Sequence, residues 1–209
     1  MRLPLATLGE LFVGLPVYRL KSLPGATVPL LSVKDVAHAD DALWQLPLVT
    51  VPDLSRVERY RLKTNDVVIT ARGTSLKSAI IPERWNGALL SSNLIAVRLG
   101  ERLHPELLLV FLQSAAGRQA IERRLTGSHL LALTPRSLGE VEVPVPSAAE
   151  QEVLAELVAL ARRQYQEALF IAEMRRQLAH RIVFERLRGT GTTSEAEGIS
   201  ENRQHQPTL

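Results

Sequence analysis

The stretch SAAEQEVLAELVALARRQYQEALFIAEMRRQLAHRIVFERLRG, residues 147–189, says most about the fold of this 209-residue chain. It opens on Ser147-Ala148-Ala149-Glu150, a capping box whose hydroxyl and carboxylate satisfy free backbone N–H groups at a helix start. Gly189 can take the left-handed conformation that closes a helix, and Arg186 and Arg188 complement the helix dipole. We expect one helix over residues 148–188, ~60 Å long at ~1.5 Å per residue.

Apolar residues recur along this helix at heptad-like spacing, with Gln164 and Arg175 as interruptions. A helix of this length exceeds what a compact domain of this size can cover. Its apolar stripe therefore needs a partner, and we expect a homodimer formed through a coiled coil. The partner-facing residues are Leu154, Leu157, Ala161, Ala168, Ile171, Leu178 and Ile182.

The preceding residues, 1–146, indicate a globular domain of mixed strands and helices, so the predicted fold class is α+β with a long C-terminal helix. Short runs rich in β-branched residues predict strands at 28–33, 67–71, 78–81 and 94–97. A helix is expected over 105–116, broken near Gly117, with a second helical piece over 118–125. A capped turn at 134–138 and an edge strand or extended exit at 141–146 complete this domain.

The remaining segment, 189–209, has almost no apolar residues and is expected to be disordered. With 45% hydrophobic and 22% charged residues, the composition is that of an ordinary soluble protein. Cysteine is absent, which excludes disulfides and thiolate metal sites. Residues 1–10 do not resemble a signal peptide, and no apolar run is long enough to span a bilayer. A cytoplasmic location is therefore expected.

The net charge of +3 is small, but its distribution is uneven. Between Arg56 and Arg98, eight basic residues face three acidic ones, which leaves +5 in that window. A concentrated positive field suits a polyanionic partner, although a solvated basic face gives the same pattern. The basic residues are Arg56, Arg59, Arg61, Lys63, Arg72, Lys77, Arg84 and Arg98.

Motifs for catalysis are missing. The sequence has no glycine-rich cofactor loop followed by a Pro-Pro-aromatic motif, no nuclease Glu-x-Lys pattern and no Walker loop. None of its five histidines stands at metal-ligand spacing from another. We therefore expect a non-enzymatic protein with no cofactor and no metal.

Polar loops between the predicted strands offer a binding surface instead. Arginine and lysine can contact guanine or phosphate, asparagine can contact adenine, and hydroxyl groups suit either kind of site. The alternative is that the glycines form turns and the hydroxyls cap backbone groups. The predicted DNA-contacting residues are Arg72, Gly73, Lys77, Arg84, Asn86, Ser92, Asn93, Ser128, His129 and Arg136.

The order of four motifs resembles the target-recognition domain of type I restriction–modification specificity subunits. The motifs are Asp66-Val67-Val68-Ile69-Thr70-Ala71-Arg72-Gly73-Thr74, then Leu90-Ser91-Ser92-Asn93-Leu94-Ile95, then Gly127-Ser128 with Leu133-Thr134-Pro135-Arg136-Ser137-Leu138, then Val143-Pro144-Val145-Pro146 with Glu150-Gln151. Asn65 stands where relatives often have glycine, and asparagine tolerates the same turn. The resemblance covers about residues 8–188.

The resemblance implies a sequence-specific DNA-binding subunit with a role in phage defence. A complete subunit of this family carries two recognition domains that read a split site, with long helices setting the gap. DNA adenine methyltransferase (modification) subunits dock on those helices, and a restriction (motor) subunit cleaves. This chain has one domain (1–146) and one helix (147–188), so a homodimer would restore the missing half. A truncated remnant that binds modification subunits only through its helix, or a stand-alone nuclease, are the competing hypotheses.

Overall fold

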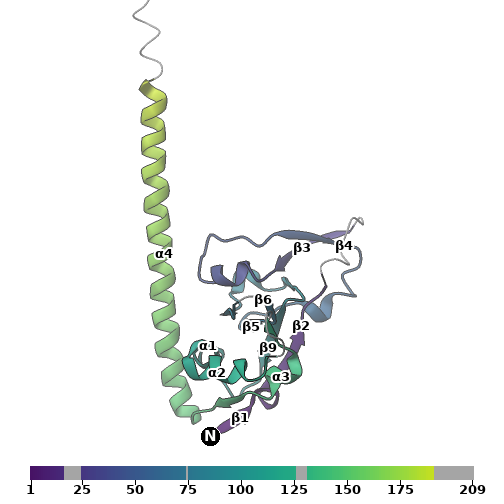
Figure 1. The fold of residues 1–209 in the computed structure, drawn as a ribbon. Helices are drawn as coiled ribbons and strands as arrows, with labels where there is room; N and C mark the ends of the chain where they lie inside the picture. The colour runs from purple at the N-terminus through teal and green to yellow at the C-terminus, as the bar shows by residue number, and fades with distance from the viewer. Residues whose placement is uncertain (17–24, 74, 126–130, 191–209) are drawn as a thin grey trace, which may run out of the picture. The chain divides into compact units, whose positions relative to one another are not determined.

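The computed structural model describes residues 1–16, 25–73, 75–125 and 131–190 (Figure 1). The chain divides into two compact units, the first ending at Gln166 and the second beginning at Glu167. That boundary falls inside α4 (Ala148–Thr190), which is one continuous helix. A strand-rich unit followed by a single long helix confirms the predicted fold class.

A four-stranded antiparallel sheet in the order β2–β9–β5–β7 forms the centre of the first unit. Side chains of β5 alternate between its two faces, so Val67 and Ile69 enter one core cluster and Val68 enters another. Because both faces are covered, the first three residues of β5 are all apolar. The strands are β2 (Gly9–Val13), β9 (Leu94–Leu99), β5 (Val67–Thr70) and β7 (Ser78–Ile80).

Three helices pack on the face of the sheet that carries Val67 and Ile69. They are α1 (Pro105–Gln113), α2 (Ala115–Glu122) and α3 (Pro135–Gly139). The break between α1 and α2 lies at Ser114, three residues before the predicted position. The Ser114 hydroxyl accepts the Gly117 N–H at 3.0 Å and so caps α2. Gly117 is needed for close packing, since a Cβ there would lie 1.9 Å from the Phe111 carbonyl oxygen.

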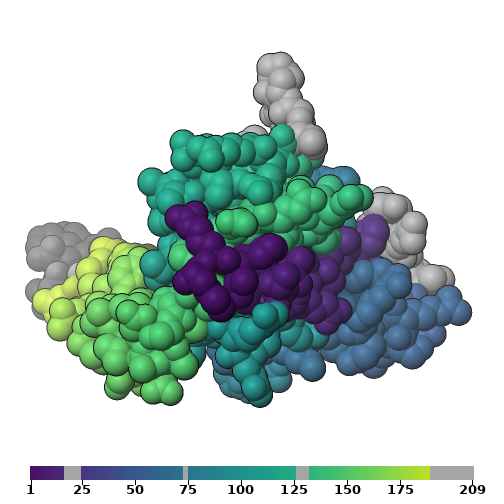
Figure 2. All heavy atoms as spheres, turned by 90° about the horizontal axis from the view of Figure 1, so that it is seen from below, coloured from purple at the N-terminus to yellow at the C-terminus, as the bar shows by residue number. Residues whose placement is uncertain are grey.

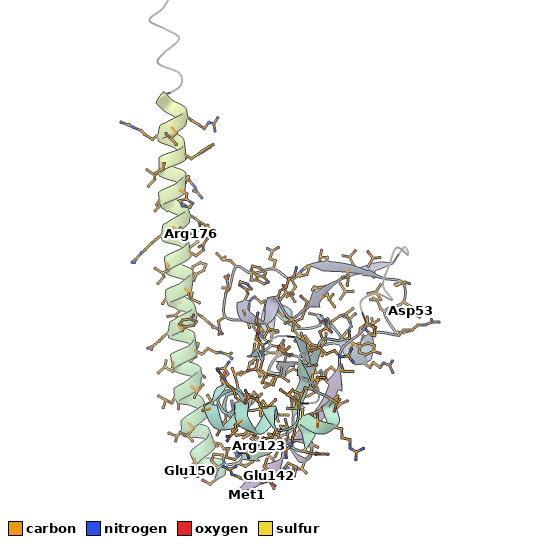
Figure 3. The ribbon with its side chains drawn as sticks, in the orientation of Figure 1. Met1, Asp53, Arg123, Glu142, Glu150 and Arg176 are labelled. Carbon is orange, nitrogen blue, oxygen red and sulfur yellow. The ribbon has the colours of Figure 1, made fainter. Side chains whose placement is uncertain are left out.

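The N-terminal strand β1 (Arg2–Pro4) pairs with β11 (Glu142–Pro144), which confirms an edge strand at the exit of the domain. Figure 2 shows the purple N-terminal residues against the green segment that contains α3 and β11. Met1, Glu142 and Glu150 lie at the same end in Figure 3, beside the start of α4. The Ser147 hydroxyl and the Glu150 carboxylate form the predicted capping box, and these hydrogen bonds lower the pKa of Glu150.

A second, three-stranded sheet orders β3 between β4 and β8. It belongs to a core cluster of its own around Val28, Leu30 and Leu89. Single 3-10 turns, η1, η3, η4 and η5, join the strands of the first unit. The bounds are β3 (Ala26–Leu31), β4 (Leu48–Val51), β8 (Leu89–Leu90), η1 (Leu5–Thr7), η3 (Asp35–His38), η4 (Glu58–Tyr60) and η5 (Glu83–Trp85).

The four strands expected from the sequence form as β3, β5, β7 and β9. Asn65, just before β5, has a φ of 71°, so the turn is left-handed as expected for a position that favours glycine. The end of α4 differs from the expectation, because Gly189 continues the helix to Thr190. Glycine permits the closing conformation but does not impose it. The tail predicted to be disordered falls, from residue 191 on, outside the described residues.

Within the described ranges, no helix combines the length and the apolar character needed to cross a membrane.

Candidate nucleic-acid interface

One end of the central sheet gathers the polar residues that follow β5 and precede β7 and β9. Arg72 comes two residues after β5, Lys77 comes just before β7, and Asn93 comes just before β9. Because β5 is antiparallel to both of its neighbours, these three positions fall at the same end of the sheet.

Backbone hydrogen bonds hold this end of the sheet in place. The Asn93 carbonyl oxygen accepts from the Ala71 N–H at 2.8 Å and from the Arg72 N–H at 3.2 Å. The Lys77 N–H donates to the Thr70 hydroxyl at 3.1 Å, while the Thr70 N–H donates to the Lys77 carbonyl at 2.9 Å. The loop residues are therefore displayed from a rigid scaffold, which is where binding residues commonly sit.

The side chains at this sheet end are available to a partner. Arg72 and Asn93 are exposed, and Lys77 and Ser92 are half-buried. None of these four side chains has a hydrogen bond or an ion pair to another residue in the described part of the chain. We name this group, Arg72, Lys77, Ser92 and Asn93, the sheet-end cluster.

A small ladder extends the cluster toward the segment between α2 and α3. Strand β6 (Arg72–Gly73) pairs with β10 (Leu131–Ala132), so Gly73 is placed opposite Leu131. The Leu133 N–H also donates to the Ala71 carbonyl at 2.8 Å. The predicted contact residues Ser128 and His129 precede β10 and lie outside the described residues.

Arg84 and Asn86 lie at the opposite end of the sheet, because they follow the far end of β7. Arg84 Nη2 donates to the carbonyl oxygens of Ala39 at 2.6 Å and Asp41 at 2.8 Å. Its guanidinium also lies 5.0 Å from the centre of the Trp85 ring, and burial lowers the pKa of Arg84. Asn86 Oδ1 accepts the Thr64 N–H at 3.3 Å. The structure gives both residues internal contacts and does not bring them to the sheet-end cluster.

Arg136 lies on α3, outside the sheet-end cluster. Its side chain is 93% exposed, and its Nε lies 3.9 Å from Glu140 Oε1. Thr134 and Ser137 form a second capping box at the start of this helix, as the predicted capped turn requires.

The basic window 56–98 contains fewer free cations than its composition suggests. Arg56, Arg61 and Arg98 form ion pairs with carboxylates, and Arg84 is held by backbone carbonyls. The composition of this window suits either a polyanionic partner or a solvated basic face. In the structure much of that charge makes contacts within the domain. Arg72 and Lys77 are the members of the window that belong to the sheet-end cluster.

Arg98, the last basic residue of the 56–98 window, has a structural role. Its Nε and Nη2 donate to the two carboxylate oxygens of Asp66 at 3.0 and 2.7 Å. Asp66 is 2% exposed, and its Oδ2 also accepts the Lys63 N–H at 2.8 Å. This bidentate pair connects β9 to the turn before β5, and so it positions the strand that leads to Arg72.

A second network, through Arg162 and Gln166, connects the part of α4 in the first unit to Asp40 and Glu106. Arg162 Nη1 lies 3.3 Å from Glu106 Oε1, and its Nε lies 3.8 Å from Asp40 Oδ1. Gln166 Nε2 donates to the same Asp40 oxygen at 2.7 Å. Glu106 is 7% exposed, and burial raises its pKa while Arg162 and His104 oppose that rise. The partners are far apart in the sequence, so no local pattern could have predicted this network.

The predicted partner-facing residues of α4 are all exposed. In the first unit these are Leu154, Leu157 and Ala161, and in the second Ala168, Ile171, Leu178 and Ile182. Phe170 and Met174 add further exposed apolar surface within the second unit. Arg176, labelled in Figure 3, pairs with Glu173 along the helix and, with Gln177, lowers the pKa of Glu173 to about 2.

Among the described residues, no group of three or more histidine, aspartate or glutamate side chains is arranged to hold a metal ion.

Comparison with known structures identifies the fold. The chain is similar to a type I restriction–modification system S subunit from M. genitalium, with 14% identity, a TM-score of 0.58, and coverage of 85% of this chain and 43% of the other. It is also similar to the HsdS subunit from Thermoanaerobacter tengcongensis, with 16% identity, a TM-score of 0.54, and coverage of 98% and 51%. A third similar structure is described as the structural basis underlying complex assembly and conformational transition of the type I R-M system. It has 16% identity and a TM-score of 0.59, and the match covers 90% of this chain and 43% of the other.

This chain therefore has the fold of a type I S subunit, as its motifs indicated, and it spans about half the length of the S subunits that it matches. No protein-family model matches the sequence, and neither does any curated protein sequence.

Proposed function

We propose that this chain is the DNA-recognition half of a type I specificity subunit and has no catalytic activity of its own. The main observation behind the proposal is the sheet-end cluster, whose side chains are free to contact a duplex. The cluster is part of a domain with the fold of a type I S subunit. Two cations and two polar side chains suit a mixture of phosphate and base contacts. The domain reads one half of a split site.

The long helix supplies the second half of the proposal. The match to about half of each S subunit supports the proposal of a single recognition domain in this chain. The exposed apolar residues of α4 need a partner, and a second copy of this chain provides the same stripe. The resulting homodimer presents two recognition domains and docks DNA adenine methyltransferase subunits, with which a restriction (motor) subunit assembles.

A second candidate rests on the same exposed stripe. A protein-only interaction module would bind methyltransferase subunits through α4 and would not discriminate among DNA sequences. The two functions separate on DNA binding alone, because only the first requires the sheet-end cluster.

The test is the salt dependence of duplex binding by the double variant Arg72→Ala/Lys77→Ala. Each phosphate contact contributes a slope of about −0.9 in a plot of log affinity against log salt concentration. We expect the variant's slope to be shallower by about 1.8. Fluorescence anisotropy with a mixed-sequence duplex at several salt concentrations measures this slope.

The matched control is Arg56→Ala/Lys63→Ala, which removes the same charge from exposed positions in the same basic window. Lys63 precedes β5 and so lies at the opposite end of the sheet from the cluster. If both double variants change the slope equally, net charge accounts for binding, and the sheet-end cluster is not the interface.

A further inference from the structure

A cavity of about 340 Å³ lies beside β7, the edge strand of the central sheet. Its walls come from η3 and the two residues after it, from β5, from β7 and the residues just before it, from α1 and α2, and from Arg162 of α4. All of these segments belong to the first unit. The volume is at the lower end of the range for small-molecule sites.

The cavity has more positive charge than its own groups neutralise. Lys77, Arg118 and Arg162 line it, and Asp40 is its one acidic lining residue. With the carboxylate of Glu106, which pairs with Arg162, three cations face two carboxylates, which leaves a charge of +1. Arg162 is already paired with Asp40 and Glu106. Lys77 and Arg118 have no hydrogen-bonding or ionic partner for their side chains among the described residues. An anion bound in the cavity would supply the partner that these two cations lack.

The rest of the lining is partly apolar. Leu109, Leu112 and Val36 contribute aliphatic surface next to the cations. Gln113 also lines the cavity, where its Nε2 donates to the Ser78 carbonyl at 3.3 Å. A ligand that fits this lining combines an anionic group with an apolar body.

We propose that this cavity binds a phosphorylated small molecule of about mononucleotide size. Its phosphate lies between Lys77 and Arg118, and its base or other apolar body packs on Leu109 and Leu112. A phosphate monoester carries about −1.5 to −2 charges at neutral pH, so it can pair with both Lys77 and Arg118. Lys77 belongs to this site and to the sheet-end cluster, whereas Arg118 belongs to this site and not to the cluster.

The test is isothermal titration calorimetry of the full chain with AMP, with inorganic phosphate and with adenosine, which lacks the phosphate. We expect AMP to bind, adenosine to bind at least about tenfold more weakly, and Arg118→Gln to weaken AMP by about tenfold, because charge-assisted hydrogen bonds contribute that much. The control is Arg123→Gln. Arg123 is exposed, lies outside the cavity and is labelled in Figure 3, so this variant should bind AMP as the wild type does.

Duplex binding by the Arg118→Gln variant distinguishes the two sources of phosphate. Unchanged duplex affinity together with weakened AMP binding supports the proposal. Absence of AMP binding by the wild type overturns it, as does equal AMP affinity in Arg118→Gln. Weakened duplex binding without any AMP binding assigns the cavity to the DNA backbone and also overturns it. Because Lys77 belongs to both sites, these results are read from the Arg118 variant, in which Arg72 and Lys77 are unchanged.

Discussion

Replacing Arg98 by methionine is expected to lower the free energy of unfolding by about 3 kcal/mol. The substitution keeps an aliphatic side chain of similar length but removes two hydrogen bonds to Asp66, at 3.0 and 2.7 Å. The Asp66 carboxylate is 2% exposed, so water cannot replace the lost guanidinium. Breaking a buried ion pair from one side is costly because it leaves the other charge uncompensated.

Urea denaturation followed by circular dichroism measures this loss. Arg56→Met is the control, since the Arg56 side chain is 85% exposed and its partner Asp53 is 47% exposed. An exposed pair of this kind contributes about 0–1 kcal/mol. Adding Asp66→Asn to the Arg98→Met variant should recover part of the stability, because it removes the buried charge. Equal losses for the Arg98 and Arg56 variants would show that the Asp66 pair has no special role.

Replacing Arg162 by methionine is expected to cost about 2–3 kcal/mol at neutral pH. Glu106 is 7% exposed, and its Oε2 has no hydrogen-bond partner among the described residues. Arg162 is the main group that offsets the burial of this carboxylate. The Arg162 side chain is 24% exposed, so the loss is smaller than for a fully buried pair.

The cost of Arg162→Met should depend on pH in a defined direction. Burial raises the folded-state pKa of Glu106 above its ordinary value of 4.5, and removing Arg162 raises it further. A group whose pKa is raised on folding favours the folded state when protonated, and this contribution is lost as pH rises through the folded pKa. The variant is therefore closest to the wild type below about pH 4.5 and is most destabilised at neutral pH.

Urea denaturation across this pH range measures the difference between the two proteins. Arg163→Met is the matched control, because Arg163 is exposed on the same turn of α4. Its effect should be small and should not vary with pH in this way. If Arg162→Met lowers the free energy of unfolding by the same amount at every pH, the charge of Glu106 is not the cause of the loss.

Local sequence patterns predicted the elements whose structure has local causes. The capping box at Ser147 and Glu150 and the apolar periodicity after it gave α4. The β-branched runs gave β5 and β9, whose residues are covered on both faces. By contrast, β2 begins at Gly9, where a Cβ would lie 2.2 Å from the Arg98 carbonyl oxygen. The need for glycine there comes from a strand about ninety residues away, and so local periodicity could not reveal it.

The candidate site was predictable in part for the same reason. Residue types identified Arg72, Lys77 and Asn93, and the antiparallel order of β5, β7 and β9 brings them together. The sequence could not separate these cations from Arg84, because the carbonyl groups that hold Arg84 belong to residues 38–41. Long-range contacts decide which cations are structural and which are free.

Selection of binding sites from a pool of random-sequence duplexes tests the central claim most directly. The full chain is incubated with the pool, bound duplexes are recovered and amplified over several rounds, and the products are sequenced. We predict enrichment of a two-part site with a constant gap, whose halves are inverted copies of each other because a homodimer reads both. A recovered pool with no sequence preference would contradict the account and would leave the long helix as a protein-binding element only.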